Sequence, residues 1–186
     1  EVLQGAPVGN RVAIIGAGGI GFDVAEYLTH HGESPTLNLT LWRREWGVGD
    51  PAVTPGGLAP EGPQPEAPAR QVWLLQRKPE RPGRRLGKTT GWIHRAALQM
   101  KGVKMLGGVS YDAITPEGLA VTINGTAQVI PADTVVICAG QDPERSLLPA
   151  LHAQGVEVHL IGGADVAAEL DAKRAIDQGT RLAATL

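Results

Sequence analysis

The residues whose types and spacing could do chemistry begin with Gly16-Ala17-Gly18-Gly19-Ile20-Gly21, which matches the pattern G-x-G-x-x-G. In this pattern the first glycine permits a tight turn, the second lets the backbone approach a pyrophosphate, and the third lets a helix pack against a strand. The pattern is informative only between a strand and a helix. An apolar run at 11–15 precedes it, and an amphipathic segment at 19–31 follows it. The motif therefore predicts a dinucleotide whose pyrophosphate lies at a helix N-terminus.

The end of a second apolar run indicates which dinucleotide binds. The run at 71–75 is followed by Gln76-Arg77-Lys78. An NAD site usually has an Asp or Glu at the end of the second strand, where the carboxylate accepts hydrogen bonds from the ribose. Two cations stand there instead, and a guanidinium and an ammonium suit the 2′-phosphate of NADP. We therefore predict a preference for NADP, with Arg77 and Lys78 contacting the 2′-phosphate.

A second apolar segment competes for the role of second strand. The segment at 37–42 lies nearer the usual spacing of about 20 residues from the glycine motif, and it ends in Arg43-Arg44. It too ends in cations, so NADP is favoured with either strand. We prefer 71–75 because its apolar run is more continuous, and the choice between the two pairs of cations stays open.

The other polar residues predict neither a catalytic group nor a metal site in this chain. Gly87-Lys88-Thr89 resembles the end of a P-loop, but Pro82 stands where the earlier glycine belongs. His94 is more typical of a packing or surface histidine than of a general base. The remaining histidines show no metal-ligand spacing with one another or with Cys138. No Ser-His-Asp signature stands out.

Regular elements must position the glycine motif and the cations. Short apolar runs predict buried strands, and apolar residues at helical spacing predict helices. The expected strands are 11–15, 71–75, 103–106, 134–138 and 158–161, and the expected helices are 19–31, 89–101 and about 166–184. Asn124-Gly125 between 119–123 and 126–130 predicts a hairpin, because both turn positions need a positive φ. The alternation predicts an α/β fold: a Rossmann-like dinucleotide-binding domain with a parallel sheet and a small β-hairpin or meander.

A segment rich in proline and glycine interrupts this pattern. Half of the 14 prolines fall between Pro35 and Pro68, and such a stretch holds neither a sheet ladder nor a long helix. We expect 33–70 to be an irregular surface insertion with a short helix near Trp42–Trp46. The expected organisation is a lead-in over 1–10, an NAD(P)-binding domain over 11–156 and a distinct C-terminal segment over 157–186.

Composition excludes several classes of protein. The net charge is −2, so no bulk positive field favours nucleic acid or an anionic membrane. No apolar run approaches the roughly 20 residues of a membrane span. Cys138 is the single cysteine, which excludes a disulfide framework within this chain and suits a reducing compartment such as the cytoplasm. The chain begins at Glu1 without an initiator Met, and we expect it to be a piece of a longer protein.

Several segments together resemble one family of enzymes. They are 12–28 around the glycine motif, 76–78, 86–95 with the sequence Leu-Gly-Lys-Thr-Thr-Gly-Trp-Ile-His-Arg, 136–141 and 159–167. As a set, they resemble the C-terminal part of the bacterial NADPH-dependent 2,4-dienoyl-CoA reductases of fatty acid β-oxidation. The likeness covers nearly all of the chain except the insertion.

The resemblance implies a multi-domain flavoenzyme related to trimethylamine dehydrogenase and old yellow enzyme. In that family an N-terminal β/α barrel carries FMN and the acyl-CoA site, and a four-cysteine segment holds an iron–sulfur (4Fe–4S) cluster. Electrons pass from NADPH to FAD, then to the cluster and FMN. The chain would hold the NADPH domain plus the closing strand and helix of the FAD domain. Its partners would then be the barrel and the remainder of the FAD domain in the same polypeptide.

The resemblance also assigns further cofactor residues. Ala139 and Gly140 lie where small residues let the backbone pass the bound NADP, and Ala17, Gly19 and Ile20 complete the glycine turn. Gly163 and Asp165 would contact FAD, with Asp165 placed to cap a helix. Two alternatives remain: a nucleotide-binding regulatory module without redox chemistry, and the same domain in an NAD(P)H:flavin oxidoreductase with another substrate. The substrate is chosen in the barrel, outside these residues.

Overall fold

The computed structural model describes residues 1–168 and 172–186. Within them the chain divides into two compact units, Glu1–Ala139 and Gly140–Leu186. The first unit contains the glycine motif and all of the strands that the structure describes. No described helix is long and apolar enough to cross a membrane.

A four-stranded parallel sheet forms the centre of the first unit. Its strands are β1 (Arg11–Ile15), β2 (Gln71–Leu75), β3 (Lys104–Leu106) and β7 (Thr134–Ile137), in the order β3-β2-β1-β7. Val12 of β1 pairs with Val72 of β2 on one side and with Thr134 of β7 on the other. β1 and β2 are apolar because both faces of this sheet are covered.

One face of the sheet carries two helices, α1 (Gly19–Thr29) and α3 (Gly91–Met100). Val12 and Ile14 of β1 point to this face, where Phe22 and Leu28 of α1 and Leu98 of α3 join them in one buried cluster. The helices pack on the strands through large apolar side chains that are almost fully buried. The short 3₁₀ helix η1 (Val2–Gln4) precedes β1, and Val2 contacts the same cluster.

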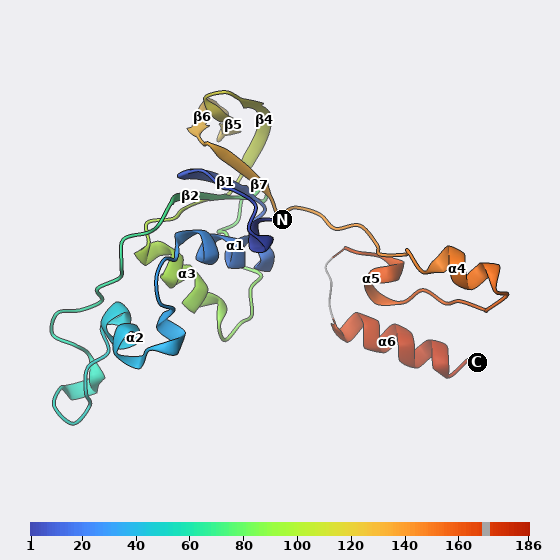
Figure 1. Ribbon diagram of the computed structural model, residues 1–186, viewed down its shortest axis with the longest axis horizontal. Coiled ribbons are helices and arrows are strands. Elements are labelled where there is room, and N and C mark those ends of the chain that lie inside the picture. The colour runs from blue at the N-terminus through green and yellow to red at the C-terminus, as the bar shows by residue number, and fades with distance from the viewer. Residues whose placement is uncertain (169–171) are drawn as a thin grey trace. The chain divides into compact units, whose positions relative to one another are not determined.

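The opposite face of the sheet is covered by a three-stranded antiparallel meander (Figure 1). Its strands are β4 (Val109–Thr115), β5 (Gly118–Ile123) and β6 (Thr126–Pro131). Ala13 and Trp73 point to this face and share a second buried cluster with Val121 and Ile130. Successive residues of a strand point to opposite faces, so β1 supplies both clusters. This arrangement of a parallel sheet, helices and a separate antiparallel sheet is the expected Rossmann-like α/β fold.

The hairpin prediction is confirmed, while the first strand of the meander was not expected. Asn124 at φ 52° and Gly125 at φ 77° form the turn between β5 and β6. The sequence did not predict β4, because its apolar and polar residues do not alternate along its whole length as in a half-buried strand. A bulge also interrupts its pairing between Tyr111 and Ala113. Its pairing partner β5 stabilises it, which a local pattern does not reveal.

The proline-rich insertion contains short helices and irregular loops. They are η2 (Pro35–Leu37), α2 (Leu39–Trp46) and η3 (Pro55–Gly57). The competing second strand at 37–42 is therefore wrong: Asn38 caps a helix there by accepting a hydrogen bond from the Leu41 amide at 3.1 Å. Once the cap is formed, the helix uses the backbone groups that a strand would need.

The second unit contains α4 (Leu148–Ala153), α5 (Gly162–Asp165) and α6 (Ala172–Ala183). The expected strand at 158–161 is wrong, because these residues have no regular structure and no described strand lies beside them. A strand needs a neighbour to satisfy its backbone groups. The expected helix at 166–184 is seen only in part, as α6: residues 166–168 are not helical, and the part of that prediction over 169–171 lies outside the described residues.

Candidate nucleotide-binding site

Gly16 makes the tight turn that ends β1. Its φ of +113° is a conformation that side chains disfavour. A Cβ at this position would also lie 2.5 Å from the carbonyl oxygen of Cys138. The Gly16 amide donates to the Leu75 carbonyl at 2.8 Å, and the Cys138 amide donates to the Ile15 carbonyl at 2.7 Å. The turn is thereby fixed between the ends of the two neighbouring strands.

Gly21 permits close contact between helix α1 and this turn. A Cβ on Gly21 would lie 1.9 Å from the carbonyl oxygen of Gly16 and 3.3 Å from Cδ1 of Leu74. Any side chain at this position would push α1 away from the sheet. Gly21 therefore has the close-packing role expected of the third glycine in the motif.

Gly18 and Gly19 face open space. Apart from the adjacent residues and the backbone of α1 itself, no described atom lies within 4 Å of a Cβ built on either residue. Gly18 is the N-cap of α1 with an ordinary extended backbone, and no side chain caps the helix there. The amide groups of the first turn therefore have room for an external acceptor, and the helix dipole favours an anion. Side chains at these two positions would fill this open space.

Arg77 and Lys78 follow β2 at the same edge of the sheet as the glycine turn. β2 pairs with β1 through Ile15 and Leu75, which brings the two strand ends together. Arg77 and Lys78 are both exposed. Among the described residues, neither forms an ion pair with a carboxylate. Two cations without a carboxylate partner have the chemistry to bind an anion.

The cations further along this loop have a different environment. Glu80 lies 3.5 Å from Arg84 and 3.3 Å from Arg85, measured between carboxylate oxygen and guanidinium nitrogen. The carboxylate thus offsets part of the positive charge of this stretch. Arg77 and Lys78 precede Glu80 in the sequence. In the described part of the chain, no ion pair with Glu80 neutralises their charge at the end of β2.

Tyr111 of the meander lies close enough to Arg77 for the positive charge to favour the ionised form of its hydroxyl. Burial raises the pKa of the Tyr111 hydroxyl, and the positive charge of Arg77 opposes that rise. The hydroxyl oxygen is buried and has no hydrogen-bond partner among the residues that the structure describes. The sequence carried no signal for this residue, because the strand that holds it was not expected.

The competing arginines lie on α2 rather than at a strand end. Trp42 and Trp46 of α2 line a pocket of about 370 Å³ together with Thr29 and His30, at the C-terminal end of α1. The glycine motif precedes the other end of α1, and a helix of this length spans about 16 Å. Arg44 also pairs with Glu66 at 3.4 Å. This geometry favours Arg77 and Lys78 for a nucleotide at the glycine turn.

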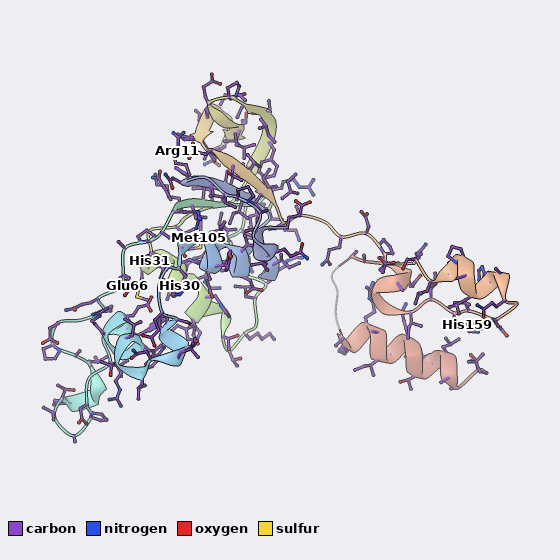
Figure 2. The ribbon with its side chains drawn as sticks, viewed as in Figure 1. Arg11, His30, His31, Glu66, Met105 and His159 are labelled. Atoms are coloured by element: carbon purple, nitrogen blue, oxygen red, sulfur yellow. The ribbon has the colours of Figure 1, made fainter. Side chains whose placement is uncertain are left out.

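The histidines and the cysteine do not assemble into a site. His94 Nδ1 lies 2.8 Å from a carboxylate oxygen of Glu26, which links α3 to α1. His30 and His31 follow α1, and His31 Nε2 lies 3.0 Å from the Ala67 carbonyl (Figure 2). The described residues contain no group of three metal-ligating side chains. Burial raises the pKa of the Cys138 thiol, which favours the neutral thiol over the thiolate.

The second unit holds the residues expected to contact FAD. Asp165 is the last residue of α5, and the three residues that follow it, 166–168, are not helical, so the expected N-cap role is wrong. Instead, Asp165 accepts a hydrogen bond from the Gln178 side chain at 3.0 Å, and Gln178 also accepts one from the Gly162 amide at 2.7 Å. Ala139 closes the first unit and Gly140, at φ +82°, opens the second.

Comparisons with known proteins identify the class of fold. Residues 1–175 match the profile of a family described as pyridine nucleotide-disulphide oxidoreductase. A metal reductase of Desulforamulus reducens is 26% identical over 165 residues, which are 88% of this chain and 23% of that protein.

Two of the solved structures that share the fold are enzymes far longer than this chain. One is a complex of 2-naphthoyl-CoA reductase with 2-naphthoyl-CoA, with a TM-score of 0.62 and 19% sequence identity. The match covers 96% of this chain and 21% of the reductase chain. The other is histamine dehydrogenase from Rhizobium sp. 4-9, with a TM-score of 0.59 and 17% sequence identity. The match covers 97% of this chain and 24% of the dehydrogenase chain. The chain thus spans less than a quarter of the length of each of these three relatives.

Proposed function

The chain belongs to the pyridine nucleotide-disulphide oxidoreductase family, and from that premise we propose that it is the NADPH-binding, electron-entry domain of a flavin oxidoreductase. Membership of the family implies binding of a nicotinamide nucleotide and a flavin. The chain itself holds one cysteine, so it lacks the pair of thiols that disulfide chemistry requires. Its role is to bind and orient the nucleotide rather than to supply a nucleophile.

The single observation that carries the proposal is the glycine cradle. Backbone atoms occupy the space where a side chain on Gly16 or Gly21 would lie, whereas Gly18 and Gly19 face open space at the N-terminus of α1. This combination suits a pyrophosphate, which needs a close backbone approach and several amide donors. Gly16, Ala17, Gly18, Gly19, Ile20 and Gly21 would hold it, with Ala139 and Gly140 beside the bound nucleotide.

The choice of NADP over NAD rests on the end of β2. The 2′-phosphate carries close to two negative charges, and Arg77 and Lys78 offer two exposed cations for it. A carboxylate at this position would instead accept from the ribose hydroxyls of NAD. When bound, NADPH supplies a hydride that a flavin accepts; the protein contributes binding, orientation and electrostatics.

The flavin and the final acceptor would involve residues outside this chain. Gly163 and Asp165 would form one edge of an FAD site, which the remainder of the polypeptide would complete. The resemblance to 2,4-dienoyl-CoA reductases favours an unsaturated acyl-CoA as acceptor, reached through a 4Fe–4S cluster and FMN. One structural relative is a reductase of a different CoA ester. A second candidate, the same domain serving another acceptor, is favoured by the likeness to a metal reductase.

The cofactor assignment is tested by titrating NADPH and NADH into variants by calorimetry. A charge-assisted hydrogen bond contributes about 1.5–3 kcal/mol, so Arg77→Ala should weaken NADPH binding by roughly 10- to 100-fold and leave NADH nearly unchanged. Lys78→Ala should act in the same direction but less, because an ammonium lacks the guanidinium fork. The effect should shrink at high salt.

Arg43→Ala serves as the matched control, since it removes an exposed cation from α2. It should leave both affinities unchanged. If Arg43→Ala abolishes the NADPH preference while Arg77→Ala does not, the 2′-phosphate is contacted by α2 and not by the residues after β2. If neither variant changes the preference, the chain does not recognise a 2′-phosphate through these cations.

A further inference from the structure

Gln76 lies between the end of β2 and the two exposed cations. Its side-chain amide nitrogen donates to the Lys78 carbonyl at 3.1 Å and to the Glu80 carbonyl at 2.6 Å. Its backbone amide donates to the Leu106 carbonyl at 3.0 Å, and its own carbonyl accepts from the Val109 amide at 3.0 Å. One residue therefore ties the loop after β2 to itself and to the start of the meander.

The loop is also packed against a glycine from the facing turn. A Cβ on Gly107 would lie 2.6 Å from the Glu80 carbonyl oxygen, 3.0 Å from that of Lys78 and 3.3 Å from that of Pro79. The Gly108 amide donates to the Lys78 carbonyl at 2.8 Å. Three successive carbonyls thus face inward, toward the Gln76 amide and the turn at 107–108.

Because the carbonyls of the loop point inward, the side chains of Arg77 and Lys78 point to solvent. Arg77 and Lys78 are exposed and have no carboxylate partner among the described residues. A loop without these internal hydrogen bonds would sample many shapes, and ordering it around a phosphate would cost affinity. A braced loop presents both cations before the ligand arrives.

We propose that Gln76 is a positioning residue for recognition of the nucleotide 2′-phosphate, acting by holding the 77–80 loop in the shape that presents Arg77 and Lys78. The inference rests on the proposed function, since it deals with the same strand end. It goes further in assigning part of the cofactor preference to a side chain that makes no contact with the cofactor.

The chemistry of the amide explains why glutamine suits this position. A primary amide has two N–H donors, and the two carbonyls of Lys78 and Glu80 use them. Methionine has nearly the same length and no donor. Glutamate is acceptor-only when ionised, so its carboxylate would face two carbonyl oxygens and be repelled.

The test compares Gln76→Met with Gln128→Met, which removes an exposed amide from β6 in the same unit. Calorimetry on the full 186-residue chain measures NADPH and NADH binding, and amide hydrogen exchange follows Gly108, whose N–H donates to Lys78. Gln76→Met should weaken NADPH binding by about 3- to 10-fold and change NADH binding by less than about 2-fold. Exchange at Gly108 should accelerate. Gln128→Met should change none of these quantities.

A second variant, Gln76→Glu, places a carboxylate near Arg77. It should weaken NADPH binding more than Gln76→Met does, and it should raise the relative affinity for NADH because a carboxylate accepts from ribose hydroxyls. The two variants separate loss of the brace from a change of local charge.

The outcomes distinguish this inference from the proposed function. Unchanged NADPH affinity in Gln76→Met, with wild-type preference for NADPH intact, would overturn the positioning role alone. An equal loss of NADPH and NADH affinity would show a general structural role and would overturn it as well. If the wild-type chain binds NADH as tightly as NADPH, the NADP assignment fails first and the inference fails with it.

Discussion

Gly18 and Gly21 show how the surroundings of a residue decide its role. Both belong to the same motif, but a Cβ on Gly18 would meet no atom within 4 Å, whereas one on Gly21 would lie 1.9 Å from the Gly16 carbonyl. Gly18 leaves open space, which the proposed function assigns to a ligand, and Gly21 allows helix and strand to pack. The motif therefore combines a binding requirement with a folding requirement.

Substitutions at these two glycines should separate the two requirements. Gly18→Val should abolish measurable NADPH binding, while the free energy of unfolding changes by no more than about 0.5 kcal/mol. Gly21→Ala should lower the free energy of unfolding by about 1–3 kcal/mol or more, because the methyl group overlaps backbone. Calorimetry measures the first quantity and chemical denaturation the second. Retained NADPH affinity in Gly18→Val would contradict the pyrophosphate assignment.

At the scale of elements, an ion pair joins the start of β1 to the start of β7. Asp133 accepts from the Arg11 backbone amide at 2.9 Å and from its guanidinium Nε at 3.0 Å, and Gly9 donates to Thr134 at 3.0 Å. The hydrogen bond from the Arg11 side chain holds the pKa of the Asp133 carboxyl below its ordinary value. These contacts fix the edge strand β7 against β1, and with it the Cys138 carbonyl that lies against Gly16.

The lowered pKa gives a pH dependence with a defined sign. A carboxyl whose pKa is depressed on folding stabilises the protein above its unfolded pKa of about 3.9, and that contribution is lost as the pH falls through the folded pKa. Asp133→Asn should therefore be less stable than wild type at neutral pH. The difference should shrink as the pH falls below the unfolded pKa and vanish below the folded pKa. Thermal unfolding of both proteins across this range measures it.

Salt provides the control for this prediction. Both side chains are partly exposed, so added salt should reduce the difference between wild type and Asp133→Asn at neutral pH. A difference that persists unchanged in acid would show that packing around residue 133, rather than ionisation of the carboxyl, stabilises the strand edge.

At the scale of the whole molecule, the chain divides into a complete sheet and a short helical unit. The candidate nucleotide residues from Gly16 to Ala139 lie in Glu1–Ala139, whereas Gly140, Gly163 and Asp165 lie in Gly140–Leu186. The described part of the second unit contains three helices and no sheet. It provides few of the surfaces that a flavin needs on all sides.

The isolated chain should therefore bind NADPH but not retain FAD. After incubation with excess FAD and gel filtration, the protein fraction should show no flavin absorbance in the visible range. NADPH titration of the same fraction should show saturable binding. Flavin that co-elutes with the chain would contradict the assignment of only one edge of the FAD site to Gly163 and Asp165.

Local patterns were sufficient for much of the fold and for the candidate site. The apolar runs at 11–15 and 71–75, the glycine motif between a strand and a helix, and the Asn124-Gly125 turn all follow from short stretches of sequence. They could be predicted because each reflects a local preference: burial of a strand, a positive φ, or space for a helix to approach. The cations after β2 were identified in the same way.

The tertiary structure decided what depends on distant partners. The sequence by itself determined a nucleotide-binding α/β domain with cations at a strand end. Pairing with β1 selected 71–75 as the second strand, and an Asn38 cap made 39–46 helical. The segment 158–161 has strand-like residues but no described neighbour with which to pair. The hydrogen bonds of Gln76 form only when the loop after β2 folds back against Gly107. No spacing of residues in the sequence predicts them. They depend on which backbone N–H and C=O groups still lack a hydrogen-bond partner once the strands have paired.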